Sequence, residues 1–363
     1  MDRSKPNRTA GKIPLLVLFV ILLIQQPIAS LAQKTGAYQP PVNPNASTEA
    51  KELLKLLYDY SGTYLLSGQH NYIGDESKHS EETEEISGEY PVVWGSDFGF
   101  ADSTNAKDAV SHRYALVAEV KKRFEAGNII TLMWHACRPT DEEPCTWKGS
   151  VQNELSEDEW NDLIQPGTRT YQNWANQVDE IAVYLKQLEL AGIPVLWRPY
   201  HEMNGDWFWW GQKPGEKGYR QLWKNLYHRL TDYRQLTNLI WVWNANATLP
   251  RENMAYDLYY PGNDYVDVLA TDIYGGNYKK SDHDQLLKLG NGKPIAMGEV
   301  GAFPSAEVFE EQPYWVWFMA WSNSNYHRNP VEKVQEMYRL GRVLGLKDFK
   351  EMEKEGNSPK QGK

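Results

Sequence analysis

The feature that most constrains this sequence is an alternation of short apolar runs with longer stretches of helical spacing. Eight apolar runs recur along the chain, at 64–67, 91–96, 129–135, 194–201, 239–244, 266–274, 294–300 and 315–321. Amphipathic stretches lie between them at 106–126, 171–191, 216–233 and 329–343. Several runs are continuously apolar, as expected for strands buried on both faces. Eight strand–helix alternations predict a (β/α)8 TIM barrel of the α/β class, folded as a single domain.

Domain boundaries follow from the same pattern. A helical stretch at 46–60 begins the domain, with Ser47 as its candidate N-cap. We predict a barrel domain over 47–345, preceded by a Pro-rich leader at 33–46 and followed by a polar C-terminal tail at 346–363. The alternative fold is an open doubly wound sheet, but the sequence has no G-x-G-x-x-G or P-loop motif to support a nucleotide-binding version of it.

The N-terminus has the pattern of a secretory signal peptide. Residues 1–32 combine a basic start, an apolar run at 13–24 and small residues before a predicted cut after Ala32. The alternative is a membrane anchor, but the run is short for the roughly 30 Å of a bilayer's hydrocarbon core. We therefore predict a secreted or periplasmic protein whose mature chain has no membrane span.

The charge of the chain limits its partners. The formal net charge is −10, and removal of residues 1–32, which hold four basic residues and Asp2, would bring it to −13. An acidic surface argues against nucleic acid and anionic membranes as partners, because both attract positive charge. We expect the mature chain to be a monomer.

The two cysteines, Cys137 and Cys145, are eight residues apart. Export permits a disulfide between them, which we favour over a pair of free thiols. The chain has no C-x-x-C or His/Cys spacing typical of a metal site.

Polar and aromatic side chains follow several predicted strands, at the end of a barrel where reactive groups lie. The third strand ends at His135, the fourth at Arg198, His201 and Glu202, the sixth at Asp272 and Tyr274, the seventh at Glu299 and the eighth at Trp321. Aromatic residues make up 13% of the chain and cluster at 207–210 and 315–321. Their flat faces complement the C–H faces of sugar rings, so this rim is a candidate carbohydrate site.

Glu202 and Glu299 form a candidate catalytic pair. Retaining glycosidases need two carboxyl groups about 5–5.5 Å apart, one protonated to donate to the leaving oxygen and one ionised to attack the sugar. We expect Trp207 and the tryptophans after it to desolvate Glu202 and raise its pKa. Arg198 and Tyr274 are expected to favour the carboxylate form of Glu299.

His135 and His201 have other possible roles. They could be zinc ligands or structural core residues, but H-E-M-N-G at 201–205 lacks the second histidine of H-E-x-x-H. We expect them instead to hydrogen-bond sugar hydroxyls, with no metal and no cofactor required.

Two segments resemble glycoside hydrolase family 26. The stretch V-L-W-R-P-Y-H-E-M-N-G-D-W-F-W-W-G at 195–211 is similar to the acid/base segment of that family, and G-E-V-G at 298–301 is similar to its nucleophile segment. The resemblance covers residues 48–340. It implies a (β/α)8 barrel with Glu202 as the acid/base after strand four and Glu299 as the nucleophile after strand seven.

The resemblance also implies roles for other residues. His201 matches the histidine before the acid/base, Trp207 a sugar-stacking tryptophan, and Tyr274 a tyrosine that contacts the nucleophile. His135 and Trp321 match sugar-subsite positions. The acidic stretch at 141–159 is longer than in short members of the family, and we expect it to shape the cleft.

The substrate expected from the resemblance is a β-mannan. Most members of the family are endo-β-1,4-mannanases, and a minority cut mixed-linkage β-glucan or β-1,3-xylan. We therefore expect retaining hydrolysis of internal β-1,4-mannosidic bonds in mannan, glucomannan or galactomannan. A same-family β-glucanase or β-1,3-xylanase and a non-catalytic sugar-binding barrel are the alternatives.

Overall fold

A computed structural model describes residues 36–323 and 328–355 of the chain. Residues 1–32, predicted as the signal peptide, lie outside the described residues. Within the described part, no helix is both long enough and apolar enough to cross a membrane.

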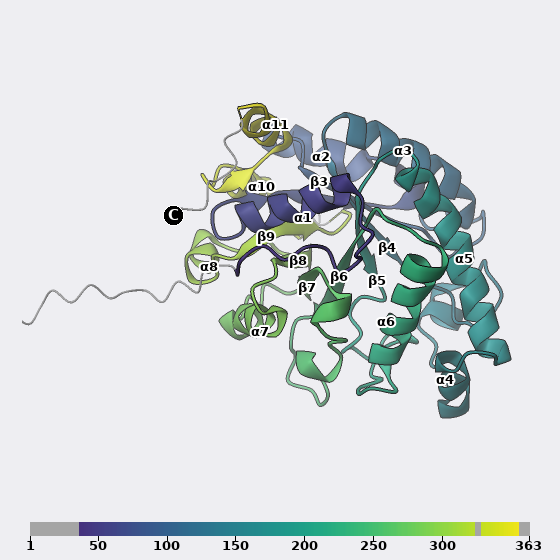
Figure 1. Cartoon of the computed structure of the whole chain (residues 1–363). Helices are drawn as coiled ribbons and strands as arrows, with labels where there is room; N and C mark the ends of the chain where they lie inside the picture. The colour runs from purple at the N-terminus through teal and green to yellow at the C-terminus, as the bar shows by residue number, and fades with distance from the viewer. Residues whose placement is uncertain (1–35, 324–327, 356–363) are drawn as a thin grey trace, which may run out of the picture. The chain divides into compact units, whose positions relative to one another are not determined.

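Parallel strands form a closed barrel in the centre of the described chain (Figure 1). The strands are β1 (Leu65–Leu66), β2 (Gly68–Asn71), β3 (Val93–Asp97), β4 (Ile129–Trp134), β5 (Val195–Pro199), β6 (Leu239–Asn246), β7 (Val268–Ile273), β8 (Ile295–Val300), β9 (Trp315–Ala320) and β10 (Val343–Leu344). Each strand from β2 to β8 pairs in parallel with the next, and β9 pairs with β8, β1 and β2. Because β1 and β2 together occupy the first position, the ring has eight positions, which confirms the predicted (β/α)8 barrel.

Helices connect the strands and surround them (Figure 1). They are α1 (Thr48–Tyr60), α2 (Lys78–Ser87), α3 (Arg113–Glu125), α4 (Glu157–Ile164), α5 (Arg169–Glu189), α6 (Tyr219–His228), α7 (Lys280–Gly290), α8 (Ala306–Glu311), α10 (Val331–Tyr338) and α11 (Leu346–Lys354). Short helical turns lie at Ile73–Asp75, Val110–His112, Trp147–Val151, Arg229–Tyr233, Tyr256–Leu258 and Asn263–Tyr265. As predicted, Ser47 caps α1, since its hydroxyl accepts a hydrogen bond from the Ala50 amide at 3.2 Å.

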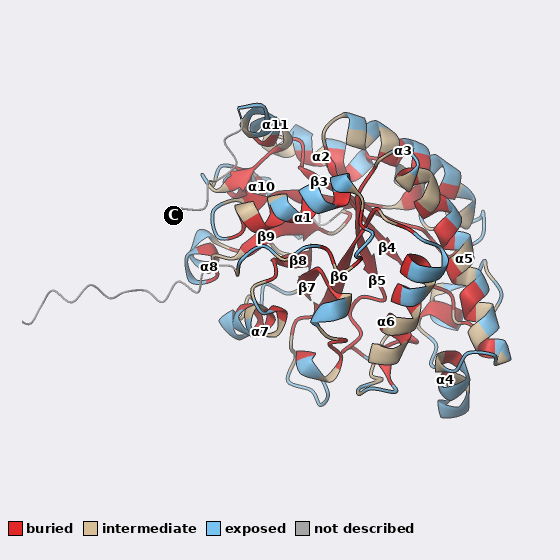
Figure 2. Ribbon diagram, in the orientation of Figure 1, coloured by how far each residue is buried: buried red, intermediate tan, exposed pale blue. Residues whose placement is uncertain are grey.

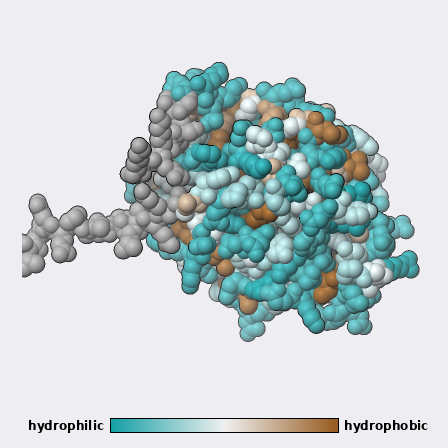
Figure 3. Space-filling model, in the orientation of Figure 1, coloured by the Kyte–Doolittle hydropathy of each residue, from teal (hydrophilic) through white to brown (hydrophobic). Residues whose placement is uncertain are grey.

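Burial divides the barrel into an apolar floor and a polar rim. Figure 2 shows strands that are buried throughout and helices whose outer faces are exposed. Apolar side chains of α1, including Leu54 and Leu57, pack with residues of the strands such as Val93, Ile240 and Val316 in one apolar cluster. Because these strand residues lie in the amino-terminal halves of their strands, α1 closes that end of the barrel, which leaves the opposite end for a site. The face in Figure 3 is mainly hydrophilic, with small, separate apolar patches.

The predicted domain boundaries differ from the packing at both ends. In the predicted leader, the Val42 amide donates to Asp267 at 2.7 Å and the Asn43 side chain to the Leu236 carbonyl at 2.8 Å. The predicted polar tail begins with helix α11, whose Phe349 is buried. Because α11 contains many charged residues, composition alone predicted a polar tail and did not indicate an amphipathic helix.

Candidate active site

The carboxyl ends of β5, β7 and β8 bring the predicted site residues together. Because all barrel strands are parallel, these ends meet on one rim. Arg198 lies in β5, which continues into His201 and Glu202, while Asp272 is in β7 and Glu299 in β8. All five side chains are buried. The structure therefore gathers residues that are up to 101 positions apart in the sequence.

Glu299 lies in a polar network. Its Oε1 accepts a hydrogen bond from Arg198 Nη2 at 2.8 Å, and its Oε2 accepts one from the Tyr274 hydroxyl at 2.5 Å. Burial raises the pKa of Tyr274 well above its usual range, so the hydroxyl keeps its proton and remains a donor. Donors of this kind stabilise a carboxylate anion. The expected placement of Arg198 and Tyr274 beside Glu299 agrees with the structure.

Glu202 lies among aromatic side chains. Burial, and then the charge of Glu299, raise the pKa of Glu202 to about 8. Trp207 acts in the opposite direction, because its indole N–H donates to Glu202 Oε2 at 2.6 Å and lowers the pKa. The expected rise of this pKa through desolvation agrees with the structure, where burial is its largest cause. The sequence analysis did not foresee the opposing hydrogen bond from Trp207, since an N–H donor favours the ionised form of its acceptor.

The chain turns sharply at the end of β5. Tyr200 and Glu202 both have left-handed backbone conformations, with φ of 46° and 56°. Such a conformation costs of the order of 1–3 kcal/mol for a non-glycine residue and persists where its surroundings hold it. Here the Glu202 amide donates to the Asn244 carbonyl at 2.8 Å, and the Trp210 indole donates to the His201 carbonyl at 2.7 Å. The turn fixes the direction in which Glu202 leaves the strand.

Two glycines allow close approaches at the site. A Cβ on Gly298 would lie 1.7 Å from Asn244 Oδ1, so only glycine lets β8 approach the Asn244 side chain this closely, one residue before Glu299. A Cβ on Gly205 would lie 2.2 Å from the Trp207 ring. The absence of a side chain there lets the indole fold back toward Glu202.

His135 is oriented by an aspartate that the sequence analysis missed. Asp97 Oδ2 lies 2.7 Å from His135 Nδ1 and accepts the His135 backbone N–H at 3.1 Å. The His135 ring lies 4.7 Å from that of His201 and 6.3 Å from that of Trp321, measured between centroids. Asp97 is the last residue of β3, one position beyond the apolar run predicted at 91–96. A predicted strand one residue longer would have placed Asp97 at a strand end, where site residues are expected.

Trp321 also joins the aromatic rim. Its ring stacks on His70 with centroids 3.9 Å apart. Trp147 and Phe208, which lie within 5.1 and 5.3 Å of the His135 ring, were not predicted as site residues. His70 went unnoticed because β2 has the polar sequence G-Q-H-N, and Trp147 because it lies in the acidic stretch at 141–159.

The loop after β4 is fixed by a disulfide and an ion pair. Cys137 and Cys145 are joined with an S–S distance of 2.12 Å. Between them, Glu143 makes a bidentate pair with the buried Arg113, at 2.6 and 2.7 Å. Both links lie close in sequence to His135 and Trp147, so they hold this side of the rim in place.

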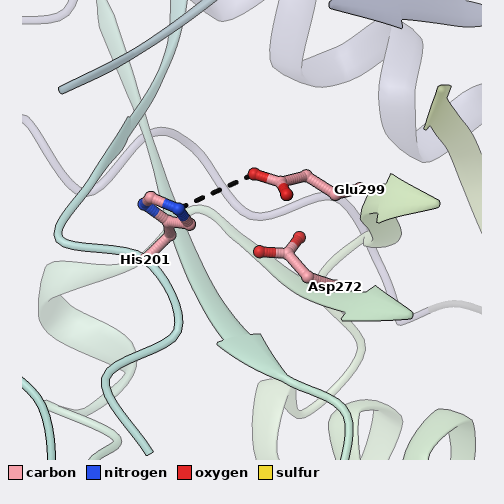
Figure 4. Close-up of side chains that lie close together, drawn as sticks. All are labelled: His201, Asp272 and Glu299. Atoms are coloured by element: carbon pink, nitrogen blue, oxygen red, sulfur yellow. Dashed lines mark ion pairs between the residues drawn. The ribbon is translucent and has the colours of Figure 1, made fainter. Parts of the chain in front are cut away.

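One group of possible metal ligands comes together among the described residues. Figure 4 shows His201, Asp272 and Glu299 pointing toward one another, and one ligand atom from each lies within 4.8 Å of the others. The guanidinium of Arg198 already lies 3.4 Å from Asp272 and 2.8 Å from Glu299. Since arginine keeps its charge, a cation here would face a resident positive group. The cluster fits an arginine-centred network better than a metal site.

A closed parallel barrel with two buried carboxyl groups on its carboxyl-end rim is the arrangement found in glycoside hydrolases. Residues 42–347 match the model of glycosyl hydrolase family 26, and the chain belongs to that family. It is therefore a glycosidase.

Relatives with known names support the same assignment. The chain is 32% identical over 319 residues to a mannan endo-1,4-β-mannosidase of Thermothelomyces thermophilus, covering 85% of this chain and 62% of that protein. It is 29% identical over 338 residues to a mannan endo-1,4-β-mannosidase of Bacillus subtilis strain 168, covering 86% and 88%. The chain thus spans less than two thirds of the first of these proteins.

Solved structures are similar as well. The structure of GH26A from Muricauda sp. MAR_2010_75 has a TM-score of 0.80 and 46% identity, covering 84% of this chain and 99% of that one. A β-(1,4)-mannanase of Podospora anserina with a GH26-CBM35 architecture has a TM-score of 0.70 and 33% identity, covering 86% and 71%.

Proposed function

We propose that the chain is a retaining endo-β-1,4-mannanase that hydrolyses internal β-1,4-mannosidic bonds in mannan, glucomannan or galactomannan. The observation that carries the mechanism is the contrast between two buried glutamates. Burial raises the pKa of Glu202 to about 8, whereas Glu299 accepts hydrogen bonds from Arg198 and Tyr274. The named relatives support mannan as the substrate.

In the first step, Glu299 attacks the anomeric carbon while Glu202 gives its proton to the departing oxygen. The glycosidic C–O bond breaks, a bond from carbon to Glu299 forms, and the shortened chain leaves as an alcohol. Arg198 and Tyr274 hold the two oxygens of Glu299, so the attacking group is oriented before the sugar binds.

In the second step, Glu202 takes a proton from water, which attacks the same carbon and releases Glu299. As a base in this step, Glu202 needs a lower pKa than it needed as an acid in the first step. The charge of Glu299 is the second cause of the raised pKa of Glu202, and that charge is gone while Glu299 carries the sugar. The pKa of Glu202 therefore falls when it must act as a base. Neither step uses a metal or a cofactor.

The aromatic rim supplies sugar contacts. Trp207 contacts Glu202, and the ring of His135 lies 4.7 Å from that of His201 and 6.3 Å from that of Trp321. In this proposal, Trp207, His135 and Trp321 contact the bound sugar chain. Burial, followed by the neighbouring His135, lowers the pKa of His201 well below its usual range, so its ring is neutral at pH 7. A neutral imidazole can hydrogen-bond a sugar hydroxyl without adding charge beside Arg198.

Product analysis tests this proposal. Mannohexaose, cello-oligosaccharides, mixed-linkage β-glucan and β-1,3-xylan would be incubated with the enzyme, and the products sized. We expect internal cleavage of the mannan substrate, and proton NMR should show the β-anomer as the first product. Cleavage of glucan without mannan would overturn the substrate assignment, and a first product with the α-configuration would overturn the retaining mechanism.

We also propose that the enzyme is exported to the periplasm or the medium after cleavage behind Ala32, and that it acts as a monomer. The disulfide supports an oxidising destination. N-terminal sequencing and light scattering of the mature protein test both points. An uncleaved N-terminus or a mass of twice the chain's would contradict them.

A further inference from the structure

The sulfur of Met133 is an acceptor for the guanidinium of Arg198. Arg198 Nη2 donates to Met133 Sδ at 2.9 Å, and the same nitrogen donates to Glu299 Oε1 at 2.8 Å. Because Nη2 carries two hydrogens, these two acceptors use both of them. Arg198 and Met133 are both buried, so this N–H group depends on the protein for its acceptor.

The pairing of β4 with β5 places the two side chains next to each other. Met133 of β4 is the register partner of Arg198 of β5. Side chains alternate between the two faces of a sheet, so register partners on parallel strands point to the same face. The contact between the sulfur and the guanidinium is therefore set by two barrel strands and not by a loop.

Three acceptors fix the orientation of the guanidinium plane. Nη1 lies 3.4 Å from Asp272 Oδ2, while Nη2 binds Glu299 and the sulfur of Met133. The guanidinium is planar and presents its N–H groups in a rigid fork, so it cannot turn without lengthening at least one of these contacts. Met133 supplies the one neutral acceptor of the three.

Another buried hydroxyl could attract the same N–H group. Ser96 lines a small internal space together with Arg198 and Met133. Its hydroxyl has no hydrogen-bond partner among the residues that the structure describes. Without the sulfur, the N–H group would gain an acceptor by turning toward this hydroxyl, and such a turn would draw Nη2 away from Glu299.

A thioether suits this position because it is neutral and a weak acceptor. A carboxylate here would compete with Glu299 and Asp272 for the single positive charge of Arg198. An aliphatic side chain would leave a buried N–H group without a partner, which costs more than a hydrogen bond contributes. Met133 thus satisfies the N–H group and leaves the charge-assisted bond to Glu299 as the stronger one.

We propose that Met133 is a positioning residue of the reaction, whose sulfur holds the guanidinium of Arg198 in the orientation in which Nη2 binds Glu299. The inference rests on the proposed function, in which Glu299 attacks the anomeric carbon. Arg198 orients the attacking carboxylate, and Met133 orients Arg198. The side chain of Met133 is buried below the rim, so it acts through Arg198 and not on the sugar.

Two substitutions separate the acceptor from the packing of the side chain. Met133→Leu keeps an apolar side chain of similar volume but has no acceptor, whereas Met133→Gln keeps an unbranched chain and supplies an amide oxygen. We expect kcat on mannohexaose to fall about tenfold in Met133→Leu, the effect of one lost hydrogen bond to a charged group, and clearly less in Met133→Gln. KM should be nearly unchanged in both variants, because Met133 does not reach the sugar.

An aryl substrate measures the first step directly. The leaving group of 4-nitrophenyl β-mannotrioside needs no proton, so its kcat/KM reports the attack by Glu299 and should also fall in Met133→Leu. Urea denaturation should rank the variants in the opposite order, with Met133→Leu the more stable, because glutamine buries an amide N–H₂ in the barrel. Activities that follow the stabilities would overturn the role of the sulfur.

Met337→Leu is the matched control, because Met337 is a buried methionine of α10, outside the site. We expect this variant to keep the wild-type kcat/KM on the aryl substrate. The comparison of the two leucine variants also decides the question if Met133→Gln does not fold. Wild-type activity in Met133→Leu, or an equal loss in both leucine variants, would overturn the proposal.

The role of Met133 can be distinguished from the choice of substrate. Mannan cleavage by the wild-type enzyme together with an unaffected Met133→Leu would overturn the role of Met133 alone. Cleavage of mixed-linkage β-glucan in place of mannan would overturn the proposed substrate alone. The variants would then be ranked on cello-oligosaccharides, where we expect the same order of activities.

Discussion

The two sides of the rim hold the same kind of side chain in contrasting surroundings. On the side of β7 and β8, Glu299 lies in a network of charged and polar groups centred on Arg198. On the side of the loop after β5, Glu202 is buried and accepts a side-chain hydrogen bond from the indole N–H of Trp207. Both carboxyl groups are buried, so burial alone does not distinguish them.

The partners make the difference. Transfer from water disfavours the ionised form of any carboxyl group. Glu299 makes an ion pair with the guanidinium of Arg198 at 2.8 Å. Glu202 makes no ion pair among the described residues, and the charge of Glu299 raises its pKa by more than the charge of Arg198 lowers it. The charge of Glu299 thus raises the pKa of Glu202 and helps keep the acid protonated.

Removal of the carboxylate on the charged side should have the largest effect. We expect Glu299→Ala to lower kcat on mannohexaose by about 10⁴-fold or more, because the attacking group is lost. Binding of the oligosaccharide, measured by calorimetry, should remain largely intact. Full turnover in this variant would contradict the proposed mechanism. Glu85→Ala, which removes an exposed carboxylate of α2, is the control variant.

The effect of removing the carboxyl group of Glu202 should depend on the leaving group of the substrate. We expect Glu202→Ala to reduce kcat/KM on mannohexaose by about 10²–10⁴-fold, the usual contribution of a general acid. With an aryl mannoside, the same variant should lose less activity in the first step, because the leaving group of that substrate needs no proton. Initial-burst kinetics with 4-nitrophenyl β-mannotrioside measure that step. If both glutamate variants lose the burst equally, the two sides do not have separate roles.

Disruption of the network should also destabilise the fold. Arg198→Met leaves Glu299 and Asp272 buried beside each other without a cation, and breaking a buried pair in this way costs about 3–5 kcal/mol. Urea denaturation at pH 7 measures the loss. Arg251→Met removes an exposed partner of Asp206 and should cost less than about 1 kcal/mol. Equal losses in the two variants would contradict a network that depends on Arg198.

The barrel and its rim were predictable from the sequence for a clear physical reason. Strands buried on both faces leave continuous apolar runs, and parallel strands bring their carboxyl ends to one rim. These two rules place Glu202, Glu299 and Tyr274 together without any contact information. They do not reveal β2, because its residues are polar and bind side chains such as Ser80, nine positions from Asn71, and Ser322, which is 252 positions from His70.

The sequence did not predict which pairs of side chains are in contact. A run of tryptophans indicates desolvation of a neighbouring glutamate, but it does not show which indole N–H points at the carboxyl group. The same limit hid the contact between Asp97, the last residue of β3, and His135, the residue after β4, which lie 38 positions apart. Such contacts depend on rotamers and strand register, and these are set only when the barrel closes.

The indole N–H on the aromatic side offers the smallest and sharpest test. Trp207→Phe keeps an aromatic ring but removes the donor to Glu202 Oε2. The pKa of Glu202 is raised to about 8 although this bond lowers it, so loss of the bond should raise the pKa further. Glu202 would then keep its proton to higher pH, and the alkaline limb of kcat/KM should move up by about one pH unit.

A tryptophan outside the site controls for the loss of an indole. Trp160→Phe is the matched control, since its indole donates to the Lys217 carbonyl, and neither residue contacts a glutamate of the site. A shift of the alkaline limb toward lower pH would mean that Trp207 raises the pKa of Glu202 by excluding water more than it lowers it by donation. In that case the aromatic side would affect the pKa of Glu202 mainly by excluding water, and the hydrogen bond from Trp207 would be the weaker influence.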